Sequence, residues 1–159
     1  IIVAINGLAI TGGMEIMLAC DMILASRTAR FADTHVRIGL LPGWGISQRL
    51  ARAIGPYRAK EFSLTGNFVD AERAFALGLL NRVAADARAT ALALAEGIAA
   101  RSQLTIRMGK AGFNAQAACA LPEAYAQAAA VMVENMMAED AKEGIGAFLE
   151  KRPPQWQDK

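Results

Sequence analysis

The feature that most constrains this sequence is an apolar stretch near its start, which glycine interrupts twice. Asn6-Gly7 indicates a turn after the apolar run Ile1–Ile5, which is predicted to be a buried strand. Gly12-Gly13 indicates a second break, followed by a helix predicted over Met14–Cys20. That helix is apolar on every side, a pattern typical of a helix buried in a protein core.

Glu15 is the one acidic side chain in this predicted helix, and it lies in the first turn. The helix dipole stabilises an acidic residue at this place in any protein. A carboxylate among Met14, Ile16 and Met17, however, needs a further reason to be buried. The glycine pair allows a ligand to approach the backbone closely, and free amides at a helix start favour an oxygen that carries negative charge. The stretch therefore predicts amide donors for an oxyanion beside a carboxylate, an arrangement suited to acyl chemistry.

Short strands and helices continue to alternate through the first half of the chain. Met22–Ala25 is predicted to be a second buried strand and Arg30–Ala32 a short one, with a turn between them. This order indicates an α/β fold with a largely parallel sheet. The further elements predicted here are a helix over 47–54 with Ser47 as its N-cap, a helix ending near Leu64, a helix capped by Asp70, and an edge strand over 79–83.

From Asp86 onward, alanine-rich helical patterns follow one another. Helices are predicted over residues 87–100, 104–117, 122–138 and 140–151. We therefore divide the chain into an α/β part, residues 1–97, and a helical part, residues 98–159. A packing stripe is predicted on the third of these helices, at Ala128, Val131, Met132, Asn135 and Met136. Spacing alone leaves open whether this stripe packs within one subunit or between subunits.

The order of these motifs resembles the enoyl-CoA hydratase/isomerase (crotonase) superfamily. Its members carry a strand, Asn-Gly, a glycine-rich turn and a helix with glutamate, as residues 4–21 do here. The similarity continues through the segments 38–50, 59–66, 76–83 and 142–152. The resemblance implies a crotonase-type spiral core, of which this chain holds the later part, followed by helices that build homotrimers or homohexamers. Because Ile1 is not Met and falls within a predicted strand, we interpret the sequence as N-terminally truncated.

The resemblance implies roles for several residues of this chain. Glu15 matches the first of two catalytic glutamates, which hold and activate a water for addition to a 2-enoyl-CoA. Gly12 matches the glycine whose amide donates one of two hydrogen bonds to the thioester oxygen; the second donor belongs to a loop before Ile1. Phe148 and Lys151, three residues apart on the last predicted helix, are expected to share a face near the acyl or coenzyme A entrance. A packed phenylalanine with a solvated lysine explains the same spacing.

His35 departs from the pattern of the family, because it stands where the second glutamate is expected. A lone histidine is often structural, but at this position we expect it to line the site. It can donate a proton or orient a water, so hydration remains chemically possible. Asp33 can orient the ring, although on a strand the two side chains would share a face.

The function predicted from the resemblance is that of an enoyl-CoA hydratase. Isomerisation, dehydration or decarboxylation through the same enolate, or a non-catalytic RNA-binding role, are the alternatives. Seven basic side chains against two acidic ones in residues 22–61 suit a phosphorylated ligand such as coenzyme A, although solvated helix faces explain them equally. The net charge of +2 and the lack of interleaved aromatics argue against nucleic acid.

No further cofactor is expected. One histidine and two distant cysteines do not form a metal ligand set, and coenzyme A arrives as part of the substrate. Cys20 and Cys119 are interpreted as reduced thiols of a cytoplasmic protein. No apolar run approaches the ~20 residues of a membrane span.

Overall fold

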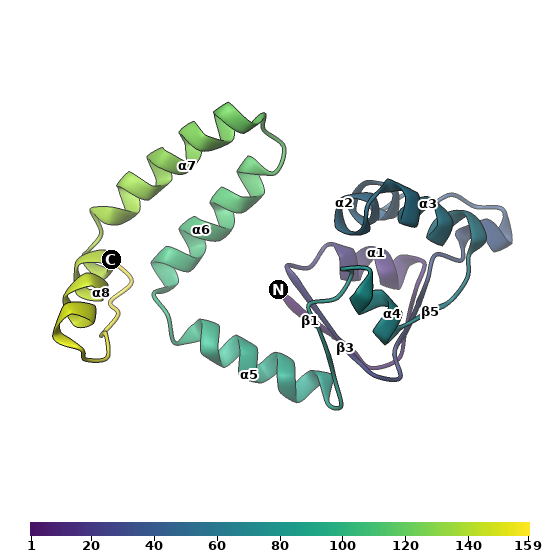
Figure 1. The fold of residues 1–159 in the computed structure, drawn as a ribbon, viewed down its shortest axis with the longest axis horizontal. Helices are drawn as coiled ribbons and strands as arrows, with labels where there is room; N and C mark the ends of the chain where they lie inside the picture. Colours follow the sequence, from purple (N-terminus) through teal and green to yellow (C-terminus); the bar gives the residue numbers. More distant parts are fainter. The chain divides into compact units, whose positions relative to one another are not determined.

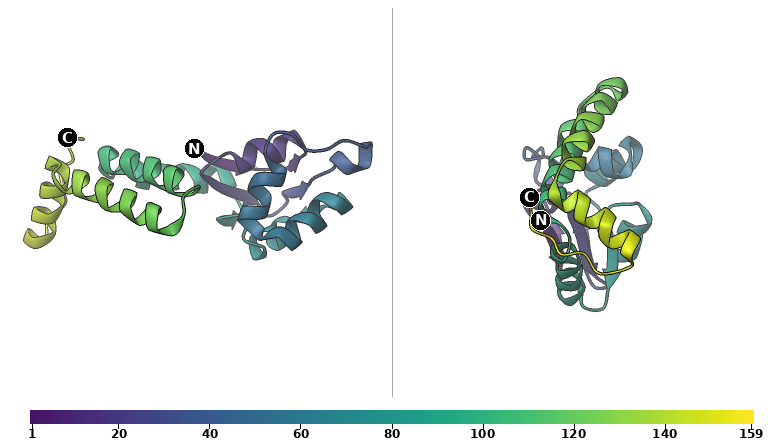
Figure 2. Two further views of the ribbon diagram at one scale, coloured as in Figure 1. Left: turned by 90° about the horizontal axis from the view of Figure 1, so that it is seen from above. Right: turned by 90° about the vertical axis from the view of Figure 1, so that its left-hand side faces the viewer.

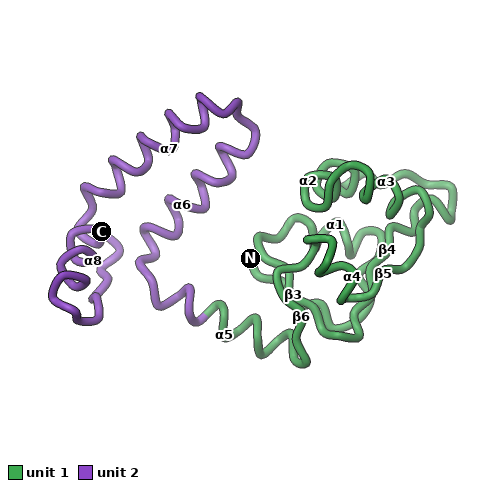
Figure 3. The backbone as a smooth tube through the Cα atoms, viewed as in Figure 1, with its two compact units in different colours: residues 1–95 green, residues 96–159 purple.

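A computed structural model describes residues 1–159, which form two compact units, Ile1–Ala95 and Glu96–Lys159 (Figure 3). The sequence places the division after residue 97. Each unit is described separately below, and the helix α5 (Ala87–Ala99) carries the chain from the first to the second.

The first sheet of the N-terminal unit is parallel throughout. Its strands are β1 (Ile2–Ile5), β3 (Met22–Ser26) and β6 (Arg82–Ala84), in the order β1-β3-β6. All three were predicted, and β3 is buried along most of its length. Strand β1 is only half-buried, contrary to the prediction, because it lies at the edge of the sheet and pairs with β3 alone.

The second sheet holds β2 (Leu8–Ile10), β4 (Arg30–Ala32) and β5 (Val69–Asp70). Strands β2 and β4 run parallel, whereas β4 and β5 run antiparallel. Strand β2 was missed in the sequence, because its three residues lie between two glycine turns and are too few to show a period. The largely parallel pairing that the sequence predicts is confirmed.

Helix α1 (Gly12–Leu18; Figure 1) begins at the glycine pair itself. Its side chains Met14, Met17 and Leu18 pack into the core. The prediction of burial on every side was wrong for Ile16, which is 66% exposed. A helix of 3.6 residues per turn points Ile16 away from the face that carries Met14 and Met17.

Three further helices complete the core of this unit. A π-helical turn, Ile46–Leu50, leads into α2 (Ala51–Ile54), and α3 (Pro56–Thr65) and α4 (Ala71–Ala76) follow. Gly45 precedes the first turn, so the predicted N-cap role of Ser47 was wrong: this serine lies inside that turn. The predicted cap at Asp70 is confirmed, because its carboxylate accepts the Arg73 N–H at 2.7 Å.

The C-terminal unit contains α6 (Gln103–Gln116), α7 (Leu121–Met136) and α8 (Glu139–Glu150), close to the predicted bounds. Helices α6 and α7 lie side by side as a hairpin (Figures 1 and 2). None of the helices combines the length and apolar character that a membrane span requires.

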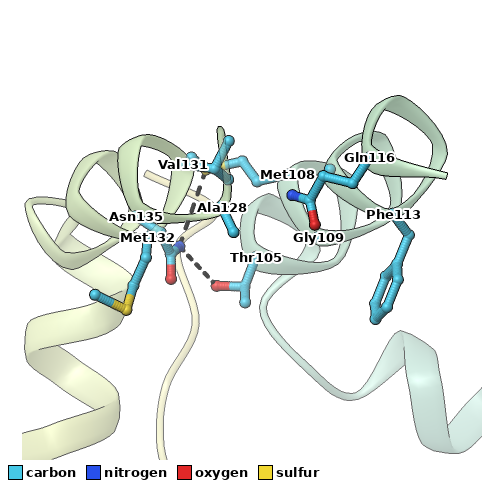
Figure 4. A pocket seen from close by; sticks show the side chains of 10 residues that line it. Thr105, Met108, Gly109, Phe113, Gln116, Ala128, Val131, Met132 and Asn135 are labelled. Atoms are coloured by element: carbon cyan, nitrogen blue, oxygen red, sulfur yellow. Dashed lines mark hydrogen bonds between the residues drawn. The ribbon is translucent and has the colours of Figure 1, made fainter. Parts of the chain in front are cut away.

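An open hollow of about 230 Å³ lies between α6 and α7 (Figure 4). Its lining includes Ala128, Val131, Met132 and Asn135, four of the five positions predicted as a packing stripe. The Asn135 amide donates to the Thr105 hydroxyl across the hairpin at 3.1 Å. Asn135 of the stripe thus makes a contact within the chain, whereas Met132 is 58% exposed.

Candidate functional site

Glu15 is a buried carboxylate held by the backbone of a distant loop. Its side chain is 3% exposed, on the first turn of α1. The Trp44 N–H donates to Glu15 Oε1 at 2.6 Å, a short bond of the kind that a charged acceptor makes. One carboxylate oxygen is thus fixed by the loop, and the orientation of the group is set before any ligand binds.

Gly12 lies at the start of the same helix, where backbone amides have no acceptor within the helix. The first intrahelical bond runs from the Glu15 N–H to the Thr11 carbonyl at 3.0 Å. The indole of Trp44 lies against Gly12: a methyl group added there would stand 3.7 Å from Cζ3 and 3.9 Å from Cε3 of the ring. Gly12, Glu15 and Trp44 therefore form one small group.

The loop that supplies Trp44 depends on glycine geometry. Gly45 has φ of +131°, a conformation that side chains rarely adopt, and the added Cβ would stand 3.3 Å from Arg49 Cδ. Trp44 itself was missed as a site residue, because Gly43-Trp44-Gly45 is too short a motif. The available signal was a large aromatic side chain between two glycines, 29 residues from the glutamate that it contacts.

His35 lies outside any strand, and the predicted strand Arg30–Ala32 is confirmed. This histidine begins the 3₁₀ turn His35–Ile38 after strand β4 has ended at Ala32. This turn brings the His35 ring onto Asp33: Nδ1 and Oδ1 are 2.7 Å apart. The Asp33 side chain is 1% exposed and that of His35 is 14% exposed. The second oxygen of Asp33 has no hydrogen-bond partner.

The register of the second sheet relates these two groups of residues. Ile10 of β2 pairs with Ala32 of the parallel strand β4, and the Thr11 N–H donates to the Ala32 carbonyl at 3.2 Å. Gly12 and Asp33 therefore follow neighbouring strands at the same carboxyl edge. This edge is where ligands usually bind in parallel sheets.

Phe148 and Lys151 belong to the C-terminal unit and do not share a helix face. Phe148 lies on α8 and is 81% exposed. Lys151 lies beyond the helix end in the left-handed conformation, with φ of 55°. The helix ends there because the amides of Lys151 and Arg152 bond back to the carbonyls of Phe148 and Ala147.

Several arginines of the basic segment 22–61 make contacts within the fold. The guanidinium groups of Arg30 and Arg37 lie 4.8 and 5.8 Å from the centre of the Phe68 ring. Arg49 Nη1 donates to the Leu18 carbonyl at 3.4 Å. These side chains stabilise the α/β unit by cation–π and hydrogen-bond contacts.

Comparison with known proteins identifies the family. The sequence model described as enoyl-CoA hydratase/isomerase matches residues 1–159. The chain belongs to the enoyl-CoA hydratase/isomerase family. It is 40% identical over 161 residues to the "Probable enoyl-CoA hydratase, mitochondrial" of Dictyostelium discoideum, covering all of this chain and 58% of that protein. It is 34% identical to the "Short-chain-enoyl-CoA hydratase" of Clostridium acetobutylicum, covering 96% of this chain and 59% of that protein.

The crystal structure of enoyl-CoA hydratase from Mycobacterium tuberculosis H37Rv superimposes on the present chain with a TM-score of 0.94, and the two sequences are 37% identical. The match covers 99% of this chain and 64% of that one. The predicted crotonase-type fold is thereby confirmed. The chain spans about three-fifths of the length of these relatives.

Proposed function

We propose that the protein containing this chain is an enoyl-CoA hydratase, which adds water to a 2-enoyl-CoA thioester or removes it. The observation that carries the proposal is the placement of Glu15, buried three residues after Gly12 in the first turn of α1 and held by the Trp44 N–H at 2.6 Å. The names of the relatives support the same reaction. The substrate is an acyl-CoA, and coenzyme A enters as part of it.

The Gly12 amide would stabilise the charge that develops during the reaction. Addition of water at C3 moves negative charge onto the thioester oxygen, which becomes enolate-like. A preorganised amide donor at such an oxygen typically contributes ~3 kcal/mol to the stability of the transition state. The resemblance implies a second donor that does not belong to residues 1–159.

Glu15 and His35 would divide the proton transfers between them. Glu15 accepts a proton from the water as its oxygen bonds to C3. His35 donates a proton to C2, in place of the second glutamate that the resemblance implies. Neither step needs a metal or a redox cofactor.

The assembly that we propose is a homotrimer or a pair of trimers, cytoplasmic, with no nucleic acid or membrane partner. Dehydration of a hydroxyacyl-CoA is the reverse of the proposed reaction, whereas isomerisation and decarboxylation are different reactions of the same enolate. Incubation with crotonyl-CoA separates them, since hydration removes the conjugated absorbance and gives 3-hydroxybutyryl-CoA.

The test of this proposal is the substitution Glu15→Gln, which keeps the shape of the side chain and removes its basicity. We expect kcat for crotonyl-CoA hydration to fall at least ~100-fold, because general base catalysis typically contributes that much. The exposed Glu61 on α3 offers a control, Glu61→Gln, which is expected to leave kcat unchanged. Equal turnover of Glu15→Gln and the unaltered protein would remove Glu15 from the mechanism.

A further inference from the structure

We propose that Asp33 is a positioning residue that holds the proton of the neutral His35 ring on Nδ1 and so presents Nε2 to the substrate. The catalytic use of Nε2 rests on the proposed function above. The position of the proton on the ring does not, and it can be measured by itself.

The contact between the two side chains is direct and sheltered from water. Asp33 Oδ1 lies 2.7 Å from His35 Nδ1, and the Asp33 side chain is 1% exposed. A carboxylate has no proton to donate, so the proton of this bond belongs to Nδ1. Neutral imidazole carries one proton, and Nε2 is then left with a free lone pair.

A purely structural role for Asp33 is the competing explanation, since the same oxygen also accepts the backbone N–H of His35. That contact is 3.4 Å long, against 2.7 Å for the ring. The longer contact lies beyond the usual range for N–H···O bonds, whereas the shorter one is typical of charge-assisted bonds. The ring is therefore the principal partner of the carboxylate.

The second carboxylate oxygen supports the same conclusion. Asp33 Oδ2 is buried without a hydrogen-bond partner, which costs free energy. A residue needed only to close the turn could be asparagine or serine, which do not bury a charged oxygen in this way. The charge of Asp33 instead lies against the Nδ1 side of the ring, where it fixes the orientation of the imidazole.

This arrangement gives the proposed reaction a complete proton balance. The imidazolium form of His35 gives its Nε2 proton to C2, where a C–H bond forms, while the other proton stays on Nδ1, hydrogen-bonded to Asp33. Water loses a proton to Glu15 as its oxygen bonds to C3. Afterwards Glu15 releases a proton to solvent and His35 takes one up, and the site is restored.

Nitrogen NMR of the ring tests the proposal directly. His35 is the one histidine among these 159 residues, and its signals are assigned by their loss in His35→Gln. On the neutral ring at alkaline pH, we expect Nδ1 to be protonated and Nε2 to be unprotonated. In Asp33→Ala, the proton is expected to move toward Nε2, the site that free histidine favours.

Asp70 provides the matched control, because its carboxylate also accepts a nearby backbone N–H, as that of Asp33 does, but contacts no histidine in the structure. Asp70→Asn is expected to leave the ring spectrum unchanged. Asp33→Asn retains the shape of the side chain and removes its charge, and we expect it to lower kcat about 10- to 100-fold with little change in KM.

A ring protonated on Nε2 in the unaltered protein, or one whose tautomer is the same in Asp33→Ala, would overturn the proposal. Should Asp33→Ala fail to fold, the spectrum of the unaltered protein still decides the tautomer. A protonated Nδ1 in a protein that does not hydrate crotonyl-CoA would sink the proposed function and leave the positioning role standing. Hydration of crotonyl-CoA by a protein whose neutral His35 carries its proton on Nε2 would support the proposed function and overturn the positioning role of Asp33.

Discussion

His35 and Glu15 differ in how their environments prepare them for proton transfer. Glu15 is fixed by a backbone amide of a loop, whereas His35 is fixed by a carboxylate two residues away. The amide anchor fixes one oxygen of Glu15, whereas the carboxylate of Asp33 contacts one ring nitrogen of His35 and leaves the other nitrogen free of this contact. Each side chain is therefore oriented by a contact within the fold, as the proton transfers that we propose for them require.

The position of His35 can be tested by exchanging it for the residue that the resemblance implies. We expect His35→Ala to lower kcat for crotonyl-CoA hydration about 100-fold, because a general acid is lost. His35→Glu is expected to retain turnover within about 10-fold of the unaltered protein, since a carboxylic acid can donate the same proton. Steady-state kinetics on both variants provide the measurement. Full activity of His35→Ala would show that this position takes no part in the proton transfer.

For single residues, the sequence predicts the burial of Glu15, because its neighbours in the helix are large apolar side chains. The structure confirms this burial. The bond from Trp44 could not be predicted, since it joins residues 29 positions apart and depends on the positive φ of Gly45. The Asp33–His35 contact was anticipated as a possibility. Its geometry was not, because the 3₁₀ turn after Ala32 carries no periodic signal.

Among the elements, helix α8 shows how ion pairs hold the end of the chain in place. After Lys151, Arg152 forms two bonds to the Glu143 carboxylate, of 2.6 and 2.9 Å, and one to Glu150 of 2.6 Å. Buried Asp140 accepts the amides of Gln157 and Asp158. The C-terminal segment 152–159 is therefore bound back onto the α8 helix through two carboxylates.

Helix ends in this protein were predictable where a local signal exists and not where distant contacts decide. The cap at Asp70 and the end of α3 near Leu64 have local signals, and both were predicted correctly. The end of α8 at Glu150 lies one residue before the predicted end at 151, and Pro153-Pro154 follow shortly after it. Beyond the helix end, Arg152 contacts Glu143, which lies nine residues earlier in the sequence, and composition does not predict this contact.

Acid is expected to release this segment. The hydrogen bond from Arg152 lowers the pKa of Glu143 to about 2, and the bond from the Ser102 hydroxyl is the main cause that lowers the pKa of Asp140. A group whose pKa is lower in the folded state contributes stability above its ordinary pKa, and loses it as the pH falls toward the folded value. For Glu143 this interval runs from its ordinary value of 4.5 down to about 2.

Trp156 reports the release, because its indole N–H donates to the Ala100 carbonyl at 3.1 Å and its ring lies over Gly144. In a Trp44→Phe background, we expect its fluorescence to shift to the red as pH falls from 4.5 to 2. Far-UV circular dichroism on the same samples separates release of the segment from loss of helices. Glu143→Gln is expected to show a shifted emission at neutral pH, and Glu139→Gln, whose residue pairs only with Lys142, is not. Emission of Trp156 that stays constant over this pH range would contradict the release of segment 152–159 by acid.

For the whole molecule, the α6–α7 hairpin leaves large apolar side chains in contact with solvent. Phe113, Tyr125, Met132 and Met137 are all more than half exposed. Apolar surface gathered on one element usually marks an interface. The helices themselves were predictable from their periodicity, but the sequence did not indicate how much of their apolar surface the chain itself covers.

Association through this hairpin is expected to be sensitive to charge on the side of α7 that lines the hollow. Met132 lies there and Val133 does not, and both are 58% exposed, so glutamate at either position alters the folded subunit about equally. In analytical ultracentrifugation we expect the unaltered protein to sediment as a trimer or hexamer. Met132→Glu should sediment as smaller species, because a carboxylate buried unpaired at an interface costs several kcal/mol. Val133→Glu should retain the assembly. A monomeric unaltered protein would show that the exposed face of α6 and α7 forms no subunit interface. Equal sedimentation of the two variants would place the interface elsewhere.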